Sequence, residues 1–180
     1  MLDRIFTPFP TLTTERLILR QLSIDDDKEI FALRSDNKVN KYLDRQPSET
    51  IEDARRFINK VSQSIKKSDL IYWAITMADK NNLLGTICLF DFSDEKNKCE
   101  IGYELLPDFQ GQGIMKEATS KIIEFGIRTV GLEEIEAFTH KDNQNSTKLL
   151  EKFGFKKSTE PDKTNPDYFI FTFKTSTGQY

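Results

Sequence analysis

The chain has few of the residues that metal sites and thiol chemistry need. Its 180 residues include one histidine and two cysteines, and Cys88 and Cys99 form no CxxC motif. A structural zinc site takes four Cys or His ligands, so we expect no metal site. Both cysteines lie in segments typical of strands, which favours two buried thiols in a reducing, cytoplasmic setting over a disulfide.

A long apolar run and an excess of positive charge are also missing. No segment approaches the roughly 20 apolar residues that cross a bilayer, and the amino terminus MLDRIFTPFP lacks the apolar core of a secretory signal. The formal net charge is −3, so no basic field is present to attract nucleic acid or acidic lipid. We expect neither a membrane nor a nucleic acid as a direct partner.

The apolar spacing predicts an α/β (α+β) fold in one domain over residues 1–180, with its core at about 13–173. Short polar connections between neighbouring strands predict antiparallel hairpins, in a mixed, mostly antiparallel sheet of six to seven strands. We expect about four helices, and the polar segment 159–165 reads as a loop. The expected strands are 17–22, 71–77, 83–92, 99–106, 135–139 and 168–173, and the expected helices are 25–34, 48–67, 114–130 and 146–153.

Glycine is scarce, with eight in the chain, yet Gly111 and Gly113 stand one residue apart between a strand and a helix. The strand must end by Pro107, and the helix begins near Ile114. Glycines permit positive φ, so successive N–H groups can turn toward one point and join the unsatisfied donors of the first helical turn. The junction is a candidate phosphate site. The alternative is a tight turn without a ligand.

Two well-known phosphate motifs are excluded by the residues that follow these glycines. A P-loop requires Gly-Lys-Ser/Thr, but Gly113 is followed by Ile114 and Met115. A dinucleotide fingerprint requires a third glycine at the position of Lys116.

Two motifs in order resemble those of the GNAT superfamily of acetyl-CoA-dependent N-acetyltransferases. The segment Gln110-Gly111-Gln112-Gly113-Ile114-Met115 matches the family's Gln/Arg-x-x-Gly-x-Gly/Ala loop except at Met115. Downstream, Asn143-Gln144-Asn145-Ser146 precedes LLEKFGF, where family members carry Asn-x-x-Ser/Ala and then Leu-x-Glu-Lys-x-Gly-Phe. The segment TERLILRQLSIDD is similar to the RimJ/RimL ribosomal-protein acetyltransferase branch, and the resemblance covers about 13–173.

The resemblance implies a GNAT fold in which splayed central strands hold acetyl-CoA as cosubstrate. It implies that the backbone of Leu105 and Leu106 pairs with the pantetheine amides. Asn143 matches the asparagine that hydrogen-bonds the pantetheine arm, and it is equally suited to cap a helix. The resemblance also implies that the coenzyme pyrophosphate is bound by the backbone N–H groups of Gln110, Gly111, Gln112, Gly113, Ile114 and Met115.

The catalytic residues are less clearly marked. The place of the family's tyrosine acid holds Leu150, so Ser146 becomes the candidate donor to the leaving thiolate, with an ordinary role at a helix start as the alternative. Glu100 resembles the strand glutamate of the histone acetyltransferase branch and is the candidate base, with a surface role as its alternative; Glu104 has weaker support. Phe138 stands where the enzyme for N-terminal alanine of a small-subunit ribosomal protein often has glutamate, so identity with that enzyme is not expected.

We therefore predict an acetyl-CoA-dependent N-acetyltransferase that transfers directly to a primary amine in a ternary complex. A lysine amine, with a pKa of about 10.4, is almost wholly protonated at pH 7, whereas an α-amine of about 7.7–8.0 is about a tenth neutral. A protein N-terminus is the first-choice acceptor, and a small amine or antibiotic is the second. The alternative function is a non-catalytic acyl-CoA-binding sensor. The sequence is compatible with a monomer or a homodimer.

Overall fold

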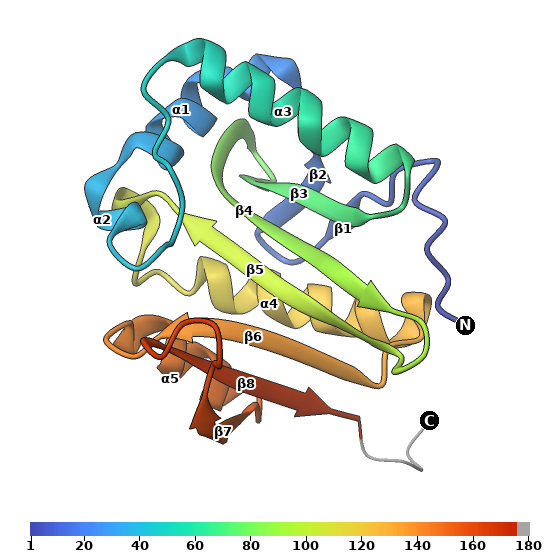
Figure 1. The fold of residues 1–180 in the computed structure, drawn as a ribbon. Helices are drawn as coiled ribbons and strands as arrows, with labels where there is room; N and C mark the ends of the chain where they lie inside the picture. The colour runs from blue at the N-terminus through green and yellow to red at the C-terminus, as the bar shows by residue number, and fades with distance from the viewer. Residues whose placement is uncertain (176–180) are drawn as a thin grey trace.

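The computed structural model describes residues 1–175, which form a continuous mixed sheet with helices on both faces (Figure 1). Within these residues the sheet has eight strands in the order β1-β2-β3-β4-β5-β6-β8-β7. Every neighbouring pair is antiparallel except β5 and β6, which are parallel. The strands are β1 (Leu12–Thr13), β2 (Leu17–Gln21), β3 (Leu70–Met77), β4 (Lys80–Ser93), β5 (Lys98–Leu105), β6 (Glu134–His140), β7 (Lys156–Pro161) and β8 (Tyr168–Lys174).

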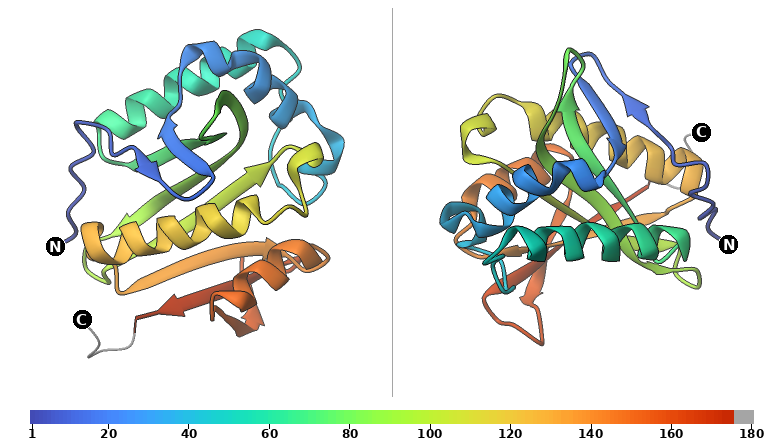
Figure 2. Two further views of the ribbon diagram at one scale, coloured as in Figure 1. Left: turned by 180° about the vertical axis from the view of Figure 1, so that it is seen from behind. Right: turned by 90° about the horizontal axis from the view of Figure 1, so that it is seen from above.

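The helices divide between the two faces of this sheet (Figure 2). One face carries α1 (Asp27–Ser35), α2 (Asn37–Asn40) and α3 (Ile51–Lys66), and the other carries α4 (Ile114–Phe125) and α5 (Gln144–Lys152). Short 3₁₀ turns occupy Ile24–Asp26 and Pro107–Phe109, and a π-helix continues α4 over Gly126–Val130.

The register of the strands decides which side chains meet each set of helices. Trp73, Ile87 and Tyr103 stand opposite one another on β3, β4 and β5, so their side chains share a face. The Trp73 ring lies 5.3 Å from that of Phe125, which places this face against α4. The alternate residues of the same strands therefore point toward α1 and α3.

β5 and β6 remain paired only over a short distance. The parallel ladder joins Lys98, Cys99 and Glu100 to residues 134–136 of β6, and it ends there. β5 stays paired with β4 as far as Leu105, while β6 follows β8 to His140. The two central strands consequently separate beyond Glu100.

The predicted fold class is confirmed: the sheet is mixed and mostly antiparallel. It has more strands than the expected six to seven because β1 and β7 were missed. β7 overlaps the segment 159–165, which was predicted as a loop because its polar residues show no apolar alternation.

Several helix bounds also differ from the prediction. The helix expected over 114–130 is α-helical only to Phe125. The last helix begins at Gln144 rather than Ser146, and the short α2 was not predicted because four residues carry too little periodicity. None of the helices within residues 1–175 combines the length and the apolar character that crossing a membrane requires.

Candidate functional site

A cavity of about 440 Å³ lies where β5 and β6 separate. Its wall combines the end of β5 and the loop after it, the first turn of α4, one face of α5, and α2 with the segment that follows it. Nine residues named as candidates from the sequence line it: Leu105, Gln110, Gly111, Gly113, Ile114, Met115, Asn143, Ser146 and the less strongly supported Glu104. Leu106, Gln112 and Glu100 do not line the cavity.

The glycine loop presents backbone donors to this cavity. Gly111 has φ of +75° and Gly113 has φ of +77°, a backbone conformation that residues other than glycine rarely adopt. Gly113 is the N-cap of α4, and no described side chain caps it, whereas Thr50 caps α3. A methyl group added at Gly111 would meet nothing within 4 Å. Because no described side chain caps α4 and residues 111–113 are exposed, the first N–H groups of the helix are available as donors at the cavity wall, as an anion site requires.

Positive side chains surround the same end of the cavity. Lys116 lies in the first turn of α4, and Lys148 and Lys152 lie one turn apart on α5. Their charges add to the positive end of the α4 dipole. The loop end of the cavity is thus suited to a ligand that carries phosphate groups.

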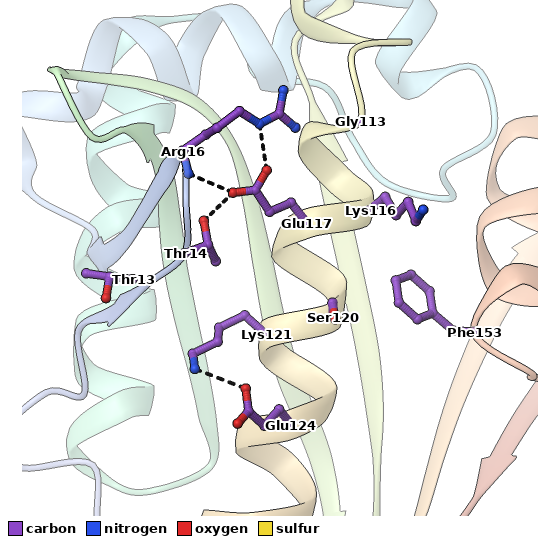
Figure 3. A pocket seen from close by; sticks show the side chains of 10 residues that line it. All are labelled: Thr13, Thr14, Arg16, Gly113, Lys116, Glu117, Ser120, Lys121, Glu124 and Phe153. Carbon is purple, nitrogen blue, oxygen red and sulfur yellow. Dashed lines mark hydrogen bonds and ion pairs between the residues drawn. The ribbon is translucent and has the colours of Figure 1, made fainter.

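The turn between β1 and β2 holds the start of α4 in place, as Figure 3 shows beside a shallow groove. The Glu117 carboxylate on α4 accepts hydrogen bonds from the Thr14 hydroxyl, from the Arg16 backbone N–H at 2.9 Å and from Arg16 Nε at 2.7 Å. Arg16 Nη1 donates to the Gln112 carbonyl at 3.1 Å. Partial burial raises the pKa of Glu117, but these hydrogen bonds outweigh it and leave the pKa below the ordinary value. The carboxylate is therefore held ionised and bound to Arg16.

The end of β5 offers one backbone edge to β4 and the other to the cavity. The Leu106 N–H donates to the Leu84 carbonyl at 2.9 Å, so it is not available for the expected pantetheine contact. By the alternation of an antiparallel ladder, the backbone groups of Leu105 face the separated side. The Leu105 carbonyl accepts a hydrogen bond from Gln110 Nε2 at 2.9 Å, which fixes the loop to the strand.

Asn143 and Ser146 form the start of α5 at the cavity wall. Asn143 is the N-cap, and its Oδ1 accepts from the Ser146 backbone N–H at 3.2 Å. This leaves the side-chain amide nitrogen of Asn143, which is on the cavity wall, as a donor for a ligand.

Tyr103 is a site residue that sequence reasoning missed. Its hydroxyl lies 2.9 Å from Ser146 Oγ, across the space between β5 and α5. Burial raises the pKa of Tyr103 to about 12, against a smaller opposite effect of Ser146. The alternation along β5 could have identified it, because Tyr103 and Leu105 point to the same face.

The two candidate bases lie on the opposite face of β5. Glu100 stands where β5 is still paired with β6, opposite Phe90 and Glu136, and is not brought together with Ser146. Burial, followed by the charge of Asp91, raises the pKa of Glu100 to about 7. Its raised pKa thus belongs to a cluster of acidic residues outside the cavity.

Glu104 does line the cavity, but its carboxylate is already paired. Both guanidinium Nη atoms of Arg45 bind it, Nη2 at 2.9 Å, and Arg45 Nε donates to Asn40 at 2.8 Å. Side-chain exposures of 17% for Arg45 and 15% for Glu104 show that water hardly competes for the pair. Such a bidentate pair occupies both carboxylate oxygens of Glu104.

The far wall of the cavity comes from the segment after α2. Tyr42 and Leu43 of this segment line the cavity together with Lys38 of α2, and the Tyr168 hydroxyl on β8 donates to the Tyr42 carbonyl at 2.7 Å. The Tyr42 ring also lies 5.4 Å from the His140 ring. These contacts fix the segment after α2 against the end of the sheet.

Three departures from the family motifs also have defined places. Leu150 is fully buried, Phe138 is 37% exposed on β6 and does not line the cavity, and Met115 is a half-buried part of the cavity wall. Met115 therefore narrows the loop end of the cavity with its side chain but leaves its N–H group at the first turn of α4.

A sheet that separates beside an exposed helix N-terminus defines an acyltransferase fold of the kind that the sequence resembles. The chain belongs to the GNAT acetyltransferase family, because the acetyltransferase (GNAT) domain model matches residues 16–156. It is an N-acetyltransferase, in agreement with its named relatives.

Its relatives and structural neighbours agree. The chain is 36% identical over 149 residues to the uncharacterized N-acetyltransferase YoaA of Bacillus subtilis, covering 83% of this chain and 84% of that protein. It is 25% identical over 162 residues to the ribosomal protein uS5-alanine N-acetyltransferase of Escherichia coli, covering 83% and 80%. The fold matches that of RimL, a ribosomal L7/L12 α-N-protein acetyltransferase solved with coenzyme A, with a TM-score of 0.82 at 18% identity over 92% and 98% of the chains.

Proposed function

We propose that this N-acetyltransferase moves the acetyl group of acetyl-CoA directly to a primary amine, with a protein N-terminus as the first-choice acceptor. The observation that carries the proposal is the cavity between β5 and β6. It runs from the exposed N-terminus of α4 to Glu104 and Tyr42 on the other side of the sheet. One cavity thus offers an anion site for the coenzyme at one end and space for the acceptor at the other, so both molecules can be bound at once.

The residues fit the coenzyme. The N–H groups of the loop from Gln110 to Met115, together with Lys116, suit its phosphates, and the backbone of Leu105 and the amide of Asn143 suit the pantetheine arm. When bound, acetyl-CoA supplies an acetyl group activated as a thioester. The chain's contribution is to hold the acceptor amine and the acetyl carbon side by side. Such positioning by itself supplies a large share of the rate acceleration of a group transfer.

An α-amine acceptor suits a cavity without an unpaired carboxylate. Glu104 is the only carboxylate among the described residues of the cavity wall, and Arg45 holds it. A lysine amine would need such a base to lose its proton near pH 7, whereas an α-amine is already about a tenth neutral. Among the relatives whose names specify an acceptor, one acts on a ribosomal-protein alanine and another is an α-N-protein acetyltransferase of L7/L12; a neighbour described as a nucleotide-linked sugar GNAT represents the small-molecule alternative.

The two cysteine thiols favour direct transfer over an acyl-cysteine intermediate. Neither Cys88 nor Cys99 lines the cavity. Burial raises the pKa of Cys88 to about 12 and moves that of Cys99 higher still. Neither thiol is ionised near neutral pH, so neither is suited to carry an acyl group.

The test is acetyl transfer from acetyl-CoA to a matched pair of peptides. One has a free N-terminus and no lysine; the other has a blocked N-terminus and one lysine. Thiol release and peptide mass are followed from pH 6.5 to 9. We expect kcat/KM at pH 7 to favour the free N-terminus by at least about tenfold, with the preference narrowing as pH rises. Transfer only to lysine, or only to small amines, would overturn the choice of acceptor. Binding of acetyl-CoA without transfer to any amine would overturn transferase activity.

A further inference from the structure

The hydroxyl groups of Tyr103 and Ser146 form a pair at the cavity wall that the known features of the fold leave without a role. Tyr103 comes from the separated part of β5 and Ser146 from the first turns of α5, and their oxygens lie 2.9 Å apart. Both residues line the cavity beside Leu105 and Asn143. The pair therefore lies where the coenzyme arm would pass.

We propose that Tyr103 is a positioning residue that donates its hydroxyl hydrogen to Ser146 Oγ and thereby directs the serine hydrogen into the cavity, toward the sulfur that leaves in the transfer. This inference rests on the proposed function. It goes beyond it by naming the group that prepares Ser146 for its role.

The direction of the hydrogen bond follows from the two hydroxyl groups. A phenol is a stronger acid than an aliphatic alcohol and is therefore the better donor of the two. Because burial raises the pKa of Tyr103 to about 12, the phenol keeps its hydrogen throughout the working pH range. Tyr103 is thus a permanent donor.

Ser146 has one remaining freedom, the rotation of its hydroxyl. Its backbone N–H is bound to Asn143 Oδ1 at 3.2 Å, which fixes the residue at the helix start. A donor on one lone pair of Oγ turns the serine hydrogen away from Tyr103 and toward the open side. A serine without this donor would sample several rotations.

The chemical step requires no proton from either hydroxyl. The amine nitrogen bonds to the acetyl carbon, the carbon–sulfur bond breaks with its electron pair on sulfur, and the amine proton passes to water. Ser146 stabilises the sulfur anion through a charge-assisted hydrogen bond and keeps its own hydrogen. Neither Tyr103 nor Ser146 has to be reprotonated for the next cycle.

The chain provides a matched control in a second tyrosine. The Tyr72 hydroxyl donates to Thr86 Oγ1 at the same distance, 2.9 Å. This pair is buried between β3 and β4 on the opposite face, outside the cavity. Tyr72→Phe therefore removes the same kind of hydrogen bond without changing a residue of the cavity wall.

The experiment is a pH titration of the thiol of bound coenzyme A, followed by thiolate absorbance against a sulfur-free analogue. It is carried out on the wild type, on Tyr103→Phe, Ser146→Ala and the double variant, and on Tyr72→Phe. We expect the wild type to lower the thiol pKa by about one unit relative to free coenzyme A, because hydrogen bonds to charged groups are the strong ones. Ser146→Ala should abolish the shift, Tyr103→Phe should remove about half of it, and Tyr72→Phe should leave it unchanged.

The double variant and a second readout decide between positioning and a structural role. If Tyr103 acts through Ser146, adding Tyr103→Phe to Ser146→Ala causes no further change. The inference would be overturned if Tyr103→Phe kept the wild-type pKa of the bound thiol. It would also be overturned if Tyr103→Phe changed that pKa as much on the Ser146→Ala background as in the wild type. Labelled-tyrosine NMR needs no tyrosine variant: the Tyr103 signal should follow thiolate formation in the wild type and not in Ser146→Ala, and a signal indifferent to Ser146 also overturns it. Failure of the wild type to bind coenzyme A would instead refute the proposed function.

Discussion

Replacing Arg16 by glutamine should weaken acetyl-CoA binding although Arg16 does not line the main cavity. Arg16 Nη1 holds the Gln112 carbonyl, and Arg16 Nε neutralises Glu117 one turn into α4. Arg16→Gln removes both contacts and keeps the backbone N–H of residue 16, which also binds Glu117. The variant is therefore expected to loosen the glycine loop and to leave a negative charge beside the proposed phosphate site.

The two effects can be given magnitudes. One hydrogen bond of a side chain that is 42% exposed contributes about 0.5 kcal/mol. An unpaired carboxylate about one Debye length (~10 Å) from a phosphate, at the effective dielectric constant of about 20 that applies near a protein surface, costs on the order of 1 kcal/mol. The sum of about 1.5 kcal/mol corresponds to a loss of about tenfold in affinity.

The assay is calorimetric titration of acetyl-CoA at low salt into the wild type, Arg16→Gln, Glu117→Gln and the double variant. Glu117→Gln on the Arg16→Gln background removes the unpaired charge and should recover about fivefold in affinity, leaving the loop contribution alone. The matched control is Arg56→Gln, which opens an ion pair to Asp53 on the exposed side of α3, where Arg56 is 70% exposed.

Wild-type affinity in Arg16→Gln would refute this reasoning. So would a double variant that binds more weakly than Arg16→Gln, because the charge of Glu117 would then not be what opposes the coenzyme. Raising the salt concentration should shrink the deficit of Arg16→Gln, since screening weakens the charge contribution but not the anchoring of the loop.

Two further predictions concern the sheet. Gly85→Ala would place a methyl 2.2 Å from the Glu104 carbonyl oxygen and 2.9 Å from Leu105 Cα. Urea unfolding should therefore show that the free energy of unfolding falls by at least about 2 kcal/mol. The control Gly111→Ala meets only the strain of its positive φ and should lose about 1 kcal/mol. The pKa of Glu100 is raised from 4.5 to about 7 in the folded chain, so between these pH values Glu100 binds a proton in the folded state that it has lost in the unfolded state. The free energy of unfolding therefore falls as pH rises from about 4.5 to about 7. Glu100→Gln should therefore stabilise the protein by about 1–2 kcal/mol at pH 8, a value reduced for partial solvent exposure, and should have no effect near pH 4; the same gain at both pH values would contradict the assignment.

The elements with strong periodicity were predictable because burial on one face imposes it. The apolar positions of α3 repeat at helical spacing, and Ala54, Ile58, Val61 and Ile65 are all buried. The glycine loop was predictable because the backbone conformation itself restricts the residue type. β7 was not, since an edge strand of polar residues leaves no such pattern.

The site was predictable only where backbone geometry or a motif defines it. Ser146 and Asn143 were predicted from the resemblance to the family's Asn-x-x-Ser/Ala motif, and the structure brings them to the cavity with the loop. Glu100 and Tyr103 show the limit: both lie on β5, and only the point at which β6 separates, beyond residue 100, decides which of them reaches the cavity. That point depends on long-range pairing between distant segments, which no local pattern contains.

The proposed coenzyme site at the N-terminus of α4 is tested most directly by titrating acetyl-CoA into the wild type and into Gly113→Glu. Gly113 is the N-cap of α4, and glutamate there adds both a bulky anion and the strain of φ at +77°. Desulfo-coenzyme A and Gly131→Ala, a second positive-φ glycine outside the cavity, serve as controls. The account predicts micromolar binding that is lost in Gly113→Glu and kept in Gly131→Ala. Equal binding by wild type and Gly113→Glu, or no binding by the folded wild type, would contradict it.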